Sequence, residues 1–254
     1  MNPYTLGPVA AILDAAYEVV AQLALLLEPV FPVAAAGAAI VVITLLLRSA
    51  LIPVGVSQAR AEVTRRRLAP RIAELRQKHA KNPERMQREL MALYAAEKTS
   101  PFAGLLPLLI QLPIVSLVYG LFTQLHVNGH SNGLLDQTVF GVPLGTSLFS
   151  DFGSGLDVQR VVLFGALLAS IAVVATLSRR FLAPLPPVAL PTGPAPAAAV
   201  TVPGAESLTR ILGYLPYLTV LFAAFVPLAA TIYLTLTTAW SFAERLILRR
   251  RMAQ

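Results

Sequence analysis

The amino-acid sequence predicts an all-α, polytopic membrane protein with five transmembrane helices, a cytoplasmic helical hairpin and an N-terminal interfacial helix. Three observations predict this fold class. Hydrophobic residues make up 56% of the 254 residues and charged residues only 13%, about half the charged share of a soluble domain. Long apolar stretches recur along the chain. The basic residues are confined to segments that can all lie on one side of a membrane.

Five apolar stretches have roughly the 20 residues that an α-helix needs to cross a bilayer. We place the spans at 31–57, 101–125, 158–178, 207–226 and 227–248. The fourth and fifth spans meet at Val226 and Pro227 without a loop between them. The proline favours a break there between two short helices. The alternative is one bent span of about 40 residues, which is far longer than a bilayer requires.

Residues 1–30 are apolar but interrupted by acids. Asp14 and Glu18 are four residues apart and share one face of a helix, whereas Leu13 and Val20 belong to an apolar stripe. We therefore predict an extracytoplasmic amphipathic helix that lies in the membrane interface. A sixth span is the alternative, and the two acids near its middle disfavour it.

Basic residues mark the cytoplasmic side. Eleven Lys or Arg lie between residues 58 and 100, and more follow the third span (Arg179, Arg180) and the fifth (249–251), whereas residues 126–157 contain none. Cationic loops resist translocation. Five spans put every basic segment in the cytoplasm, with the N-terminus outside and the C-terminus inside. Four or six spans would place a basic segment and an acid-only segment on the same side.

The basic loop at 58–100 has the pattern of a helical hairpin. Apolar residues recur with helical spacing in both halves, at Leu68, Ile72 and Leu75 and at Met86, Leu90 and Leu93. Asn82 and Pro83 suit the N-cap and first position of a second helix, and Pro70 predicts a kink in the first. A charged spacer without this packing is the alternative.

The remaining segments are polar connections. Residues 126–157 form an extracytoplasmic loop, and residues 249–254 a basic cytoplasmic tail. Residues 179–206 are rich in Pro and Ala, so we expect a flexible cytoplasmic linker there.

Arg48 is the strongest candidate for a functional residue, because apolar sequence flanks it on both sides. An arginine at the bilayer centre costs about 2.5–3.5 kcal/mol even on permissive scales, so it needs water, a partner or a polar cavity. The alternative is that it reaches the cytoplasmic surface from the end of a shorter span. Thr44 lies one turn earlier on the same face, and Glu244 is the one acid within the spans that offers itself as a partner.

Other polar residues in the spans carry weaker signals. Gln111 lies between Pro107 and Pro113, and Tyr233 and Thr237 are four residues apart. Such side chains often bond to their own helix or bridge to a neighbour.

Enzyme chemistry has no support in the sequence, which lacks a metalloprotease, nucleophile-elbow or phosphate-loop motif. His126 and His130 lie in a loop without cysteine, so a metal site there is a weak hypothesis. We expect no enzyme activity, no cofactor and no bound metal. The basic hairpin suits phosphates of RNA or of lipid headgroups and predicts no sequence-specific recognition of nucleic acid.

Three stretches in this order resemble the YidC family of membrane protein insertases, which has mitochondrial and chloroplast relatives. They are Thr44–Pro53 (TLLLRSALIP), Leu68–Leu75 (LAPRIAEL) and Ser100–Pro113 (SPFAGLLPLLIQLP), with Tyr119 following. The last span, with Tyr233, is also similar. The resemblance covers about residues 8–250.

This resemblance implies five core helices around a hydrophilic groove that opens to the cytoplasm and to lipid. Arg48 would be the groove's arginine, Thr44 a neighbouring groove residue, and Gln111, Tyr233 and Thr237 further lining. The hairpin would receive substrates with its cations, which are Arg65, Arg66, Arg67, Arg71, Arg76, Lys78, Arg85 and Arg88.

The implied function is insertion of nascent hydrophobic segments into a bacterial cytoplasmic membrane. The implied partners are nascent membrane proteins and membrane lipids, with the ribosome and the Sec translocon as further candidates. A small anion transporter or channel, in which Arg48 binds the anion, is the rival hypothesis. The absence of an internal repeat disfavours it.

Overall fold

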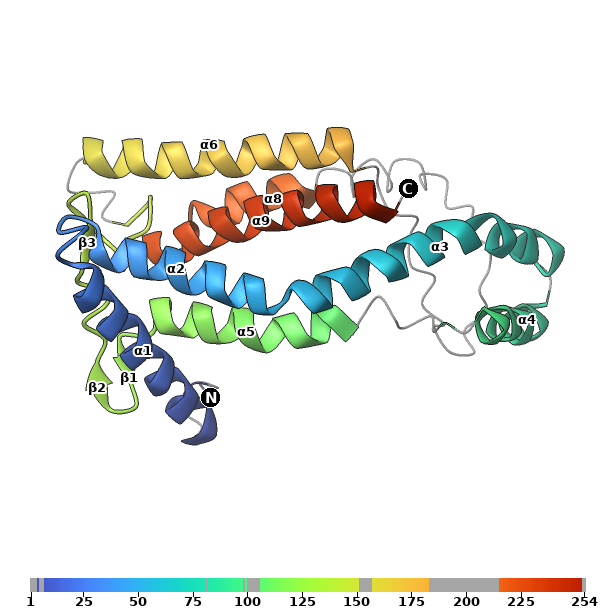
Figure 1. Cartoon of the computed structure of the whole chain (residues 1–254), viewed down its shortest axis with the longest axis horizontal. Helices are drawn as coiled ribbons and strands as arrows, with labels where there is room; N and C mark the ends of the chain where they lie inside the picture. Colours follow the sequence, from blue (N-terminus) through green and yellow to red (C-terminus); the bar gives the residue numbers. More distant parts are fainter. Residues whose placement is uncertain are drawn as a thin grey trace.

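Helices packed side by side form a bundle, and a helical hairpin projects from one end of it (Figure 1). The computed structural model describes residue 4 and residues 7–80, 82–97, 99, 106–150, 157–182 and 215–252. The helices are α1 (Gly7–Leu27), α2 (Ala35–Ala50), α3 (Ile52–Lys78), α4 (Pro83–Ala96), α5 (Leu106–Thr123), α6 (Val158–Phe181), α8 (Leu215–Ala223) and α9 (Leu228–Met252). The predicted helical fold is confirmed at this level.

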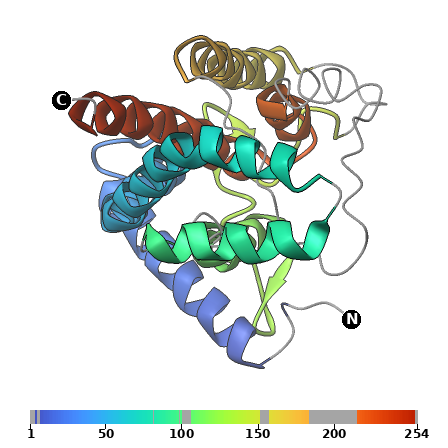
Figure 2. The same ribbon diagram turned by 90° about the vertical axis from the view of Figure 1, so that its right-hand side faces the viewer.

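Helices α2 and α9 pack against each other, and they form the middle of the bundle. Helix α1 packs on α2, and α6 packs on α9, so α1 and α6 lie on opposite sides of the central pair (Figures 1 and 2). Small side chains at the contacts, such as the buried Ala39 and Ala229, let the helix backbones approach closely.

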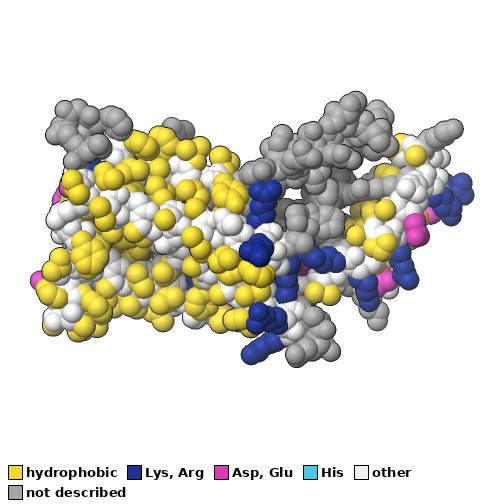
Figure 3. Space-filling view, turned by 90° about the horizontal axis from the view of Figure 1, so that it is seen from above, with side chains coloured by type: hydrophobic (Ala, Val, Ile, Leu, Met, Phe, Trp, Pro, Cys, Tyr) yellow, Lys and Arg dark blue, Asp and Glu magenta, His cyan; other side chains and the backbone are white. Residues whose placement is uncertain are grey.

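The outer surface of the bundle is apolar. Figure 3 shows hydrophobic side chains over the bundle and Lys and Arg side chains gathered beyond one end of it. Among the described residues, α1 and α6 are long and apolar enough to cross a membrane, and the bent pair α2–α3 would make a third span. The count of five spans and the placement of α1 at the interface stay predictions.

The chain bends sharply within the predicted first span. Helices α2 and α3 meet at Leu51 at an angle of 54°. The predicted end of the span, residue 57, lies within α3, and the extent of the span stays a prediction. The reason for the bend is Pro53, in the first turn of α3, since proline has no N–H and suits a helix start. Residues 52–57 therefore belong to the long helix of the hairpin.

The hairpin consists of α3 and α4. Helix α3 continues through Pro70, and the kink that we expected there stays a prediction. The side chain of Asn82 accepts a hydrogen bond from the Arg85 backbone N–H at 3.0 Å, and Pro83 opens α4, as the sequence predicted. Leu68 and Ile72 are buried on α3, whereas α4 has no buried residue.

Helices α8 and α9 are separate, with the break at Pro227. The Thr231 hydroxyl donates to the carbonyls of Ala223 and Pro227 at 2.9 and 3.2 Å, which satisfies backbone acceptors that the break leaves open. Most of the predicted linker at 179–206 and the start of the predicted span at 207–226 lie outside the described residues.

Two short β-hairpins cover one end of the bundle, in the loop at 126–157. They pair β1 (His126–Val127) with β2 (His130–Ser131) and β3 (Thr138–Val139) with β4 (Val142–Pro143). Their two-residue turns have positive φ throughout, at Asn128 and Gly129 and at Phe140 and Gly141, as tight hairpin turns require.

Candidate functional site

The last turn of α2 carries Arg48 into the interior of the molecule. Arg48 is only 8% exposed, and its terminal nitrogen Nη2 has no hydrogen-bond partner among the described residues. A buried guanidinium without full hydrogen bonding is costly, so this nitrogen requires water or another acceptor. The end of α2 therefore carries a buried polar group whose hydrogen bonding is incomplete within the described residues.

Helix α9 presents three more unsatisfied polar groups. The Thr237 hydroxyl, the Trp240 indole N–H and Glu244 Oε1 are buried, and none makes a hydrogen bond to a described residue. Their spacing of three and four residues puts them on one face of the helix. Helix α9 therefore carries a stripe of buried polar groups without hydrogen-bond partners among the described residues.

Gly55 on α3 completes the arrangement. A methyl group at this residue would lie 1.7 Å from Glu244 Oε1, so the Glu244 carboxyl group fills the space that a side chain would need. We name Arg48, Gly55, Thr237, Trp240 and Glu244 the Arg48 cluster. These residues lie at the end of α2, at the start of α3 and in the middle of α9, three helices that pack on one another. Their open polar groups can bind water.

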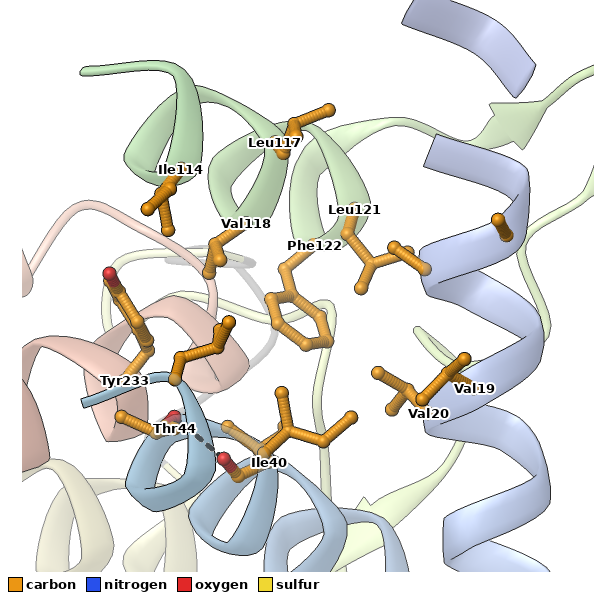
Figure 4. Close-up of a pocket in the computed structure, with 14 residues that line it drawn as sticks. Val19, Val20, Ile40, Thr44, Ile114, Leu117, Val118, Leu121, Phe122 and Tyr233 are labelled. Carbon is orange, nitrogen blue, oxygen red and sulfur yellow. Dashed lines mark hydrogen bonds between the residues drawn. The ribbon is translucent and has the colours of Figure 1, made fainter. Parts of the chain in front are cut away.

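Thr44 and Tyr233 line a neighbouring cavity of about 380 Å³ between α1, α2, α5 and α9. The other lining side chains are apolar, among them Ile40, Val118 and Phe122 (Figure 4). The Thr44 hydroxyl donates to the Ile40 carbonyl at 2.6 Å, so its one donor is used within its own helix. Arg48 is not among the lining residues.

The candidate groove residues therefore lie in two environments. Arg48 and Thr237 belong to the polar cluster, and Thr44 and Tyr233 face the apolar cavity. Gln111 belongs to α5, but its side chain lies outside the described part of the structure. Within the described residues, no group of three or more His, Asp and Glu could hold a metal ion.

Comparison with known proteins identifies the family. The profile of the 60Kd inner membrane protein family matches residues 27–254. The chain belongs to this family. Relatives named membrane protein insertase YidC occur in Clostridium perfringens, 42% identical over 86 residues, and in Caulobacter vibrioides, 31% identical over 138 residues. A third, from Chlamydia caviae, is 40% identical over 85 residues.

These alignments cover 34%, 54% and 34% of the chain. They cover 36%, 22% and 11% of the three relatives, so the chain matches about a third or less of the length of each. The family is a family of inner membrane proteins, and the apolar helices of this member agree with that location.

In this member of the 60Kd inner membrane protein family, acids neutralise part of the hairpin's charge. Glu97 pairs with Arg67 and with Arg71, the latter at 3.1 Å, and Glu62 pairs with Arg66 at 3.0 Å. Lys78, Arg85 and Arg88 are exposed. The side chains of Arg65 and Arg76 lie outside the described part.

Two further contacts fix the hairpin. Glu62 also pairs with Arg249 at the end of α9, which ties the base of α3 to the bundle. His79, which caps the C-terminal end of α3, lies with its Nε2 2.9 Å from a Glu89 oxygen on α4, and this contact joins the two helices near their turn. The hairpin is thus held at both ends by contacts between charged or titratable groups.

Sequence reasoning missed Gly55 and Trp240. The sequence pattern pointed to Tyr233 and Thr237 at a spacing of four, whereas the buried polar groups continue from Thr237 to Trp240 and Glu244. Trp240 is the only tryptophan of the chain, which was an available signal. Gly55 carried none, because its role depends on a residue far away in the sequence.

Proposed function

We propose that this protein is a membrane protein insertase that helps hydrophobic segments of nascent proteins enter a bacterial cytoplasmic membrane. Family membership and the names of its relatives support the activity. The observation that carries the mechanism is Arg48, buried in the bundle with Nη2 left open. The role of the hairpin cations in receiving substrates belongs to the same proposal.

The proposed orientation follows from charge. Five spans would put the hairpin, the linker and the tail on the cytoplasmic side and the loop at 126–157 outside. The gathering of basic side chains beyond one end of the apolar bundle supports this orientation (Figure 3). Asp14 supports an interfacial α1, because its carboxylate bonds to Asn128 and His130 of that loop rather than facing lipid.

In the proposed mechanism, an incoming segment first meets the cytoplasmic hairpin. Its short polar or acidic flank then enters the hydrated region around Arg48, which shortens the apolar barrier that the flank has to cross. The guanidinium attracts acidic groups in the flank, and a low effective dielectric strengthens this attraction. The apolar part moves into lipid, and the burial of its surface supplies the free energy.

The deciding experiment is insertion into lipid vesicles that contain only this protein. The substrates are two single-span proteins that differ only in the flank, which is either acidic or neutral. Replacing Arg48 by Ala should lower insertion of the acidic substrate roughly tenfold relative to the neutral one, since a hydrogen bond to a charged group contributes about 1.5–3 kcal/mol.

Arg48→Lys is the matched control, because it keeps the charge and loses the planar donor pattern. It should retain part of the preference for the acidic substrate. Equal losses for both substrates in Arg48→Ala would exclude the electrostatic role. Anion flux across the vesicle membrane without any insertion would favour the transporter hypothesis.

A further inference from the structure

The end of the bundle opposite the cytoplasmic hairpin carries an exposed apolar patch. Val30, Phe31 and Val33 lie in the connection between α1 and α2, and all three are exposed. Phe140 lies in the turn between β3 and β4 and is 62% exposed. We name these four residues the outer patch. Strand β3 and the start of α2 lie at this end of the bundle, and α3 and α4 project from the other end (Figure 1).

Two contacts hold the parts of the outer patch together. The Phe140 backbone N–H donates to the Val33 carbonyl at 3.3 Å. A methyl group at Gly37, in the first turn of α2, would lie 2.6 Å from the Val139 side chain, so β3 rests directly on α2. The turn and the connection therefore form one surface that is fixed to the bundle.

Phe140 occupies a backbone position that disfavours it. Its φ is +51°, in the left-handed region where a bulky side chain is strained. The matching turn between β1 and β2 has Asn128 at this position, one of the residues that such turns prefer. Strained residues persist where other contacts compensate them, yet most of the Phe140 side chain is exposed. An apolar partner outside the chain would supply the missing burial.

Lipid is the partner that fits this patch. Residues 29–35 and 137–143 contain no Lys, Arg, Asp or Glu, so the patch offers no charge to recognise a partner. It continues the exposed apolar side chains of Leu25 and Leu26 on α1, a helix apolar enough to cross a membrane. A protein interface has a polar rim around its apolar core, whereas this patch merges with the apolar surface of the bundle.

We propose that the outer patch lies in the lipid of the extracytoplasmic leaflet and that Phe140 and Phe31 anchor the β3–β4 turn there. The side of the membrane follows from the orientation proposed above. Burial of the exposed apolar surface in lipid drives the contact. Part of the loop at 126–157 is then embedded in the membrane, and this anchor sets the depth of the start of α2.

Spin labels on single cysteines test the proposal, because the chain has no cysteine of its own. Phe140→Cys and Phe31→Cys probe the patch, and Asp136→Cys is the matched control, an exposed residue of the same loop. The labelled proteins are placed in phosphatidylcholine vesicles. Collisions with a polar nickel chelate should be at least about fivefold rarer at residues 140 and 31 than at 136, because apolar surroundings exclude the chelate. Collisions with oxygen, which concentrates in lipid, should be more frequent.

Phe140→Asn tests the anchor itself. It removes the apolar side chain and suits the turn, as Asn128 does in the turn between β1 and β2. In this variant the label at Phe31→Cys should collide more often with the chelate, because the patch moves toward water. Phe140→Leu keeps the apolar side chain and should leave the label at its original depth.

Three outcomes would overturn the proposal. The first is equal collision with the chelate at residues 140, 31 and 136, which would place the patch in water. The second is protection of residues 140 and 31 from both the chelate and oxygen, which would show that protein, such as a second copy of the chain, covers the patch. The third is an unchanged label depth in Phe140→Asn. No substrate takes part in these measurements, so their failure leaves the insertase proposal standing.

Discussion

His130 and Asn128 join the loop at 126–157 to Asp14 of helix α1. His130 Nε2 lies 2.9 Å from an Asp14 oxygen, and Asn128 donates to the other oxygen at 2.8 Å. The imidazole ring also packs against Tyr17, with ring centroids 4.9 Å apart. The hydrogen bond to Asp14, followed by the contact with the Ser131 carbonyl, raises the pKa of His130.

This raised pKa predicts that the β1–β2 hairpin is held more firmly at mildly acidic pH. A histidine whose pKa is higher in the folded state contributes stability that is fully present below its unfolded pKa of about 6.5 and is lost as pH rises through the folded value. Asp14 and Glu18 are the acids that act on it. Hydrogen exchange at the Val127 amide, corrected for the intrinsic rate, should therefore accelerate as pH rises.

His130→Asn keeps a polar side chain and removes the titration, so its exchange should lose this pH dependence. A pH profile that is the same in both proteins would contradict the assignment. The histidine pair was visible in the sequence, where we considered it only as a weak metal hypothesis. Its actual partner could not be foreseen, because Asp14 lies 116 residues away.

Some members of the Arg48 cluster could be predicted because they are unusual in their own stretch of sequence, and others could not because their roles depend on contacts with distant residues. Arg48 stands out because a cation within an apolar stretch is costly wherever the chain folds. Glu244 stands out as an acid for the same reason. Gly55 and Trp240 acquire their roles only when α3 and α9 come together, and no local pattern encodes that contact.

At the scale of elements, helix starts were the most predictable features. Asn82 and Pro83 begin α4 as their side-chain chemistry requires, and Pro227 precedes α9. The β-hairpins were not predicted, because strands of two residues are too short to show an alternating pattern. The break at Leu51 was missed because the apolar sequence continues across it to Val56.

The cap of α4 gives a prediction for one element. Asn82→Ala should remove the acceptor for the Arg85 N–H and cost about 1 kcal/mol of helix stability. Amide exchange in the first turn of α4 should become roughly fivefold faster. Asn82→Ser, which keeps a capping oxygen, should exchange nearly as slowly as the unmodified protein; equal acceleration in both variants would show that the cap does not stabilise α4.

At the scale of the whole molecule, apolar surface and positive charge are separated. Hydrophobic side chains cover the bundle, and Lys and Arg side chains gather beyond one end of it (Figure 3). The hairpin and the last turns of α6 and α9 carry basic side chains. The helical fold class followed from composition and periodicity alone. The number of spans does not follow as directly, since α1 satisfies the length and apolarity of a span while its Asp14 bonds to a polar loop.

The orientation of the molecule can be tested directly because the chain contains no cysteine. Asp136 lies in the loop at 126–157 and Met91 lies on α4, and both are exposed. A membrane-impermeant thiol reagent should label Asp136→Cys in intact cells and Met91→Cys only after lysis, because the proposed orientation puts the positive hairpin in the cytoplasm. Labelling of both from the same side would rule out the proposed topology.

The angle between α2 and α3 has a mechanical consequence. Helix α3 has 27 residues and is about 40 Å long at 1.5 Å per residue, whereas Gly55 lies only about 6 Å from the bend. Glu62 is paired with Arg249 of α9, so the start of α3 is held to the bundle and a swing of the hairpin has to begin beyond Glu62. Lys78 lies about 24 Å past Glu62 along the helix, so a small rotation there carries the far end through a large arc while the backbone beside Glu244 stays almost still.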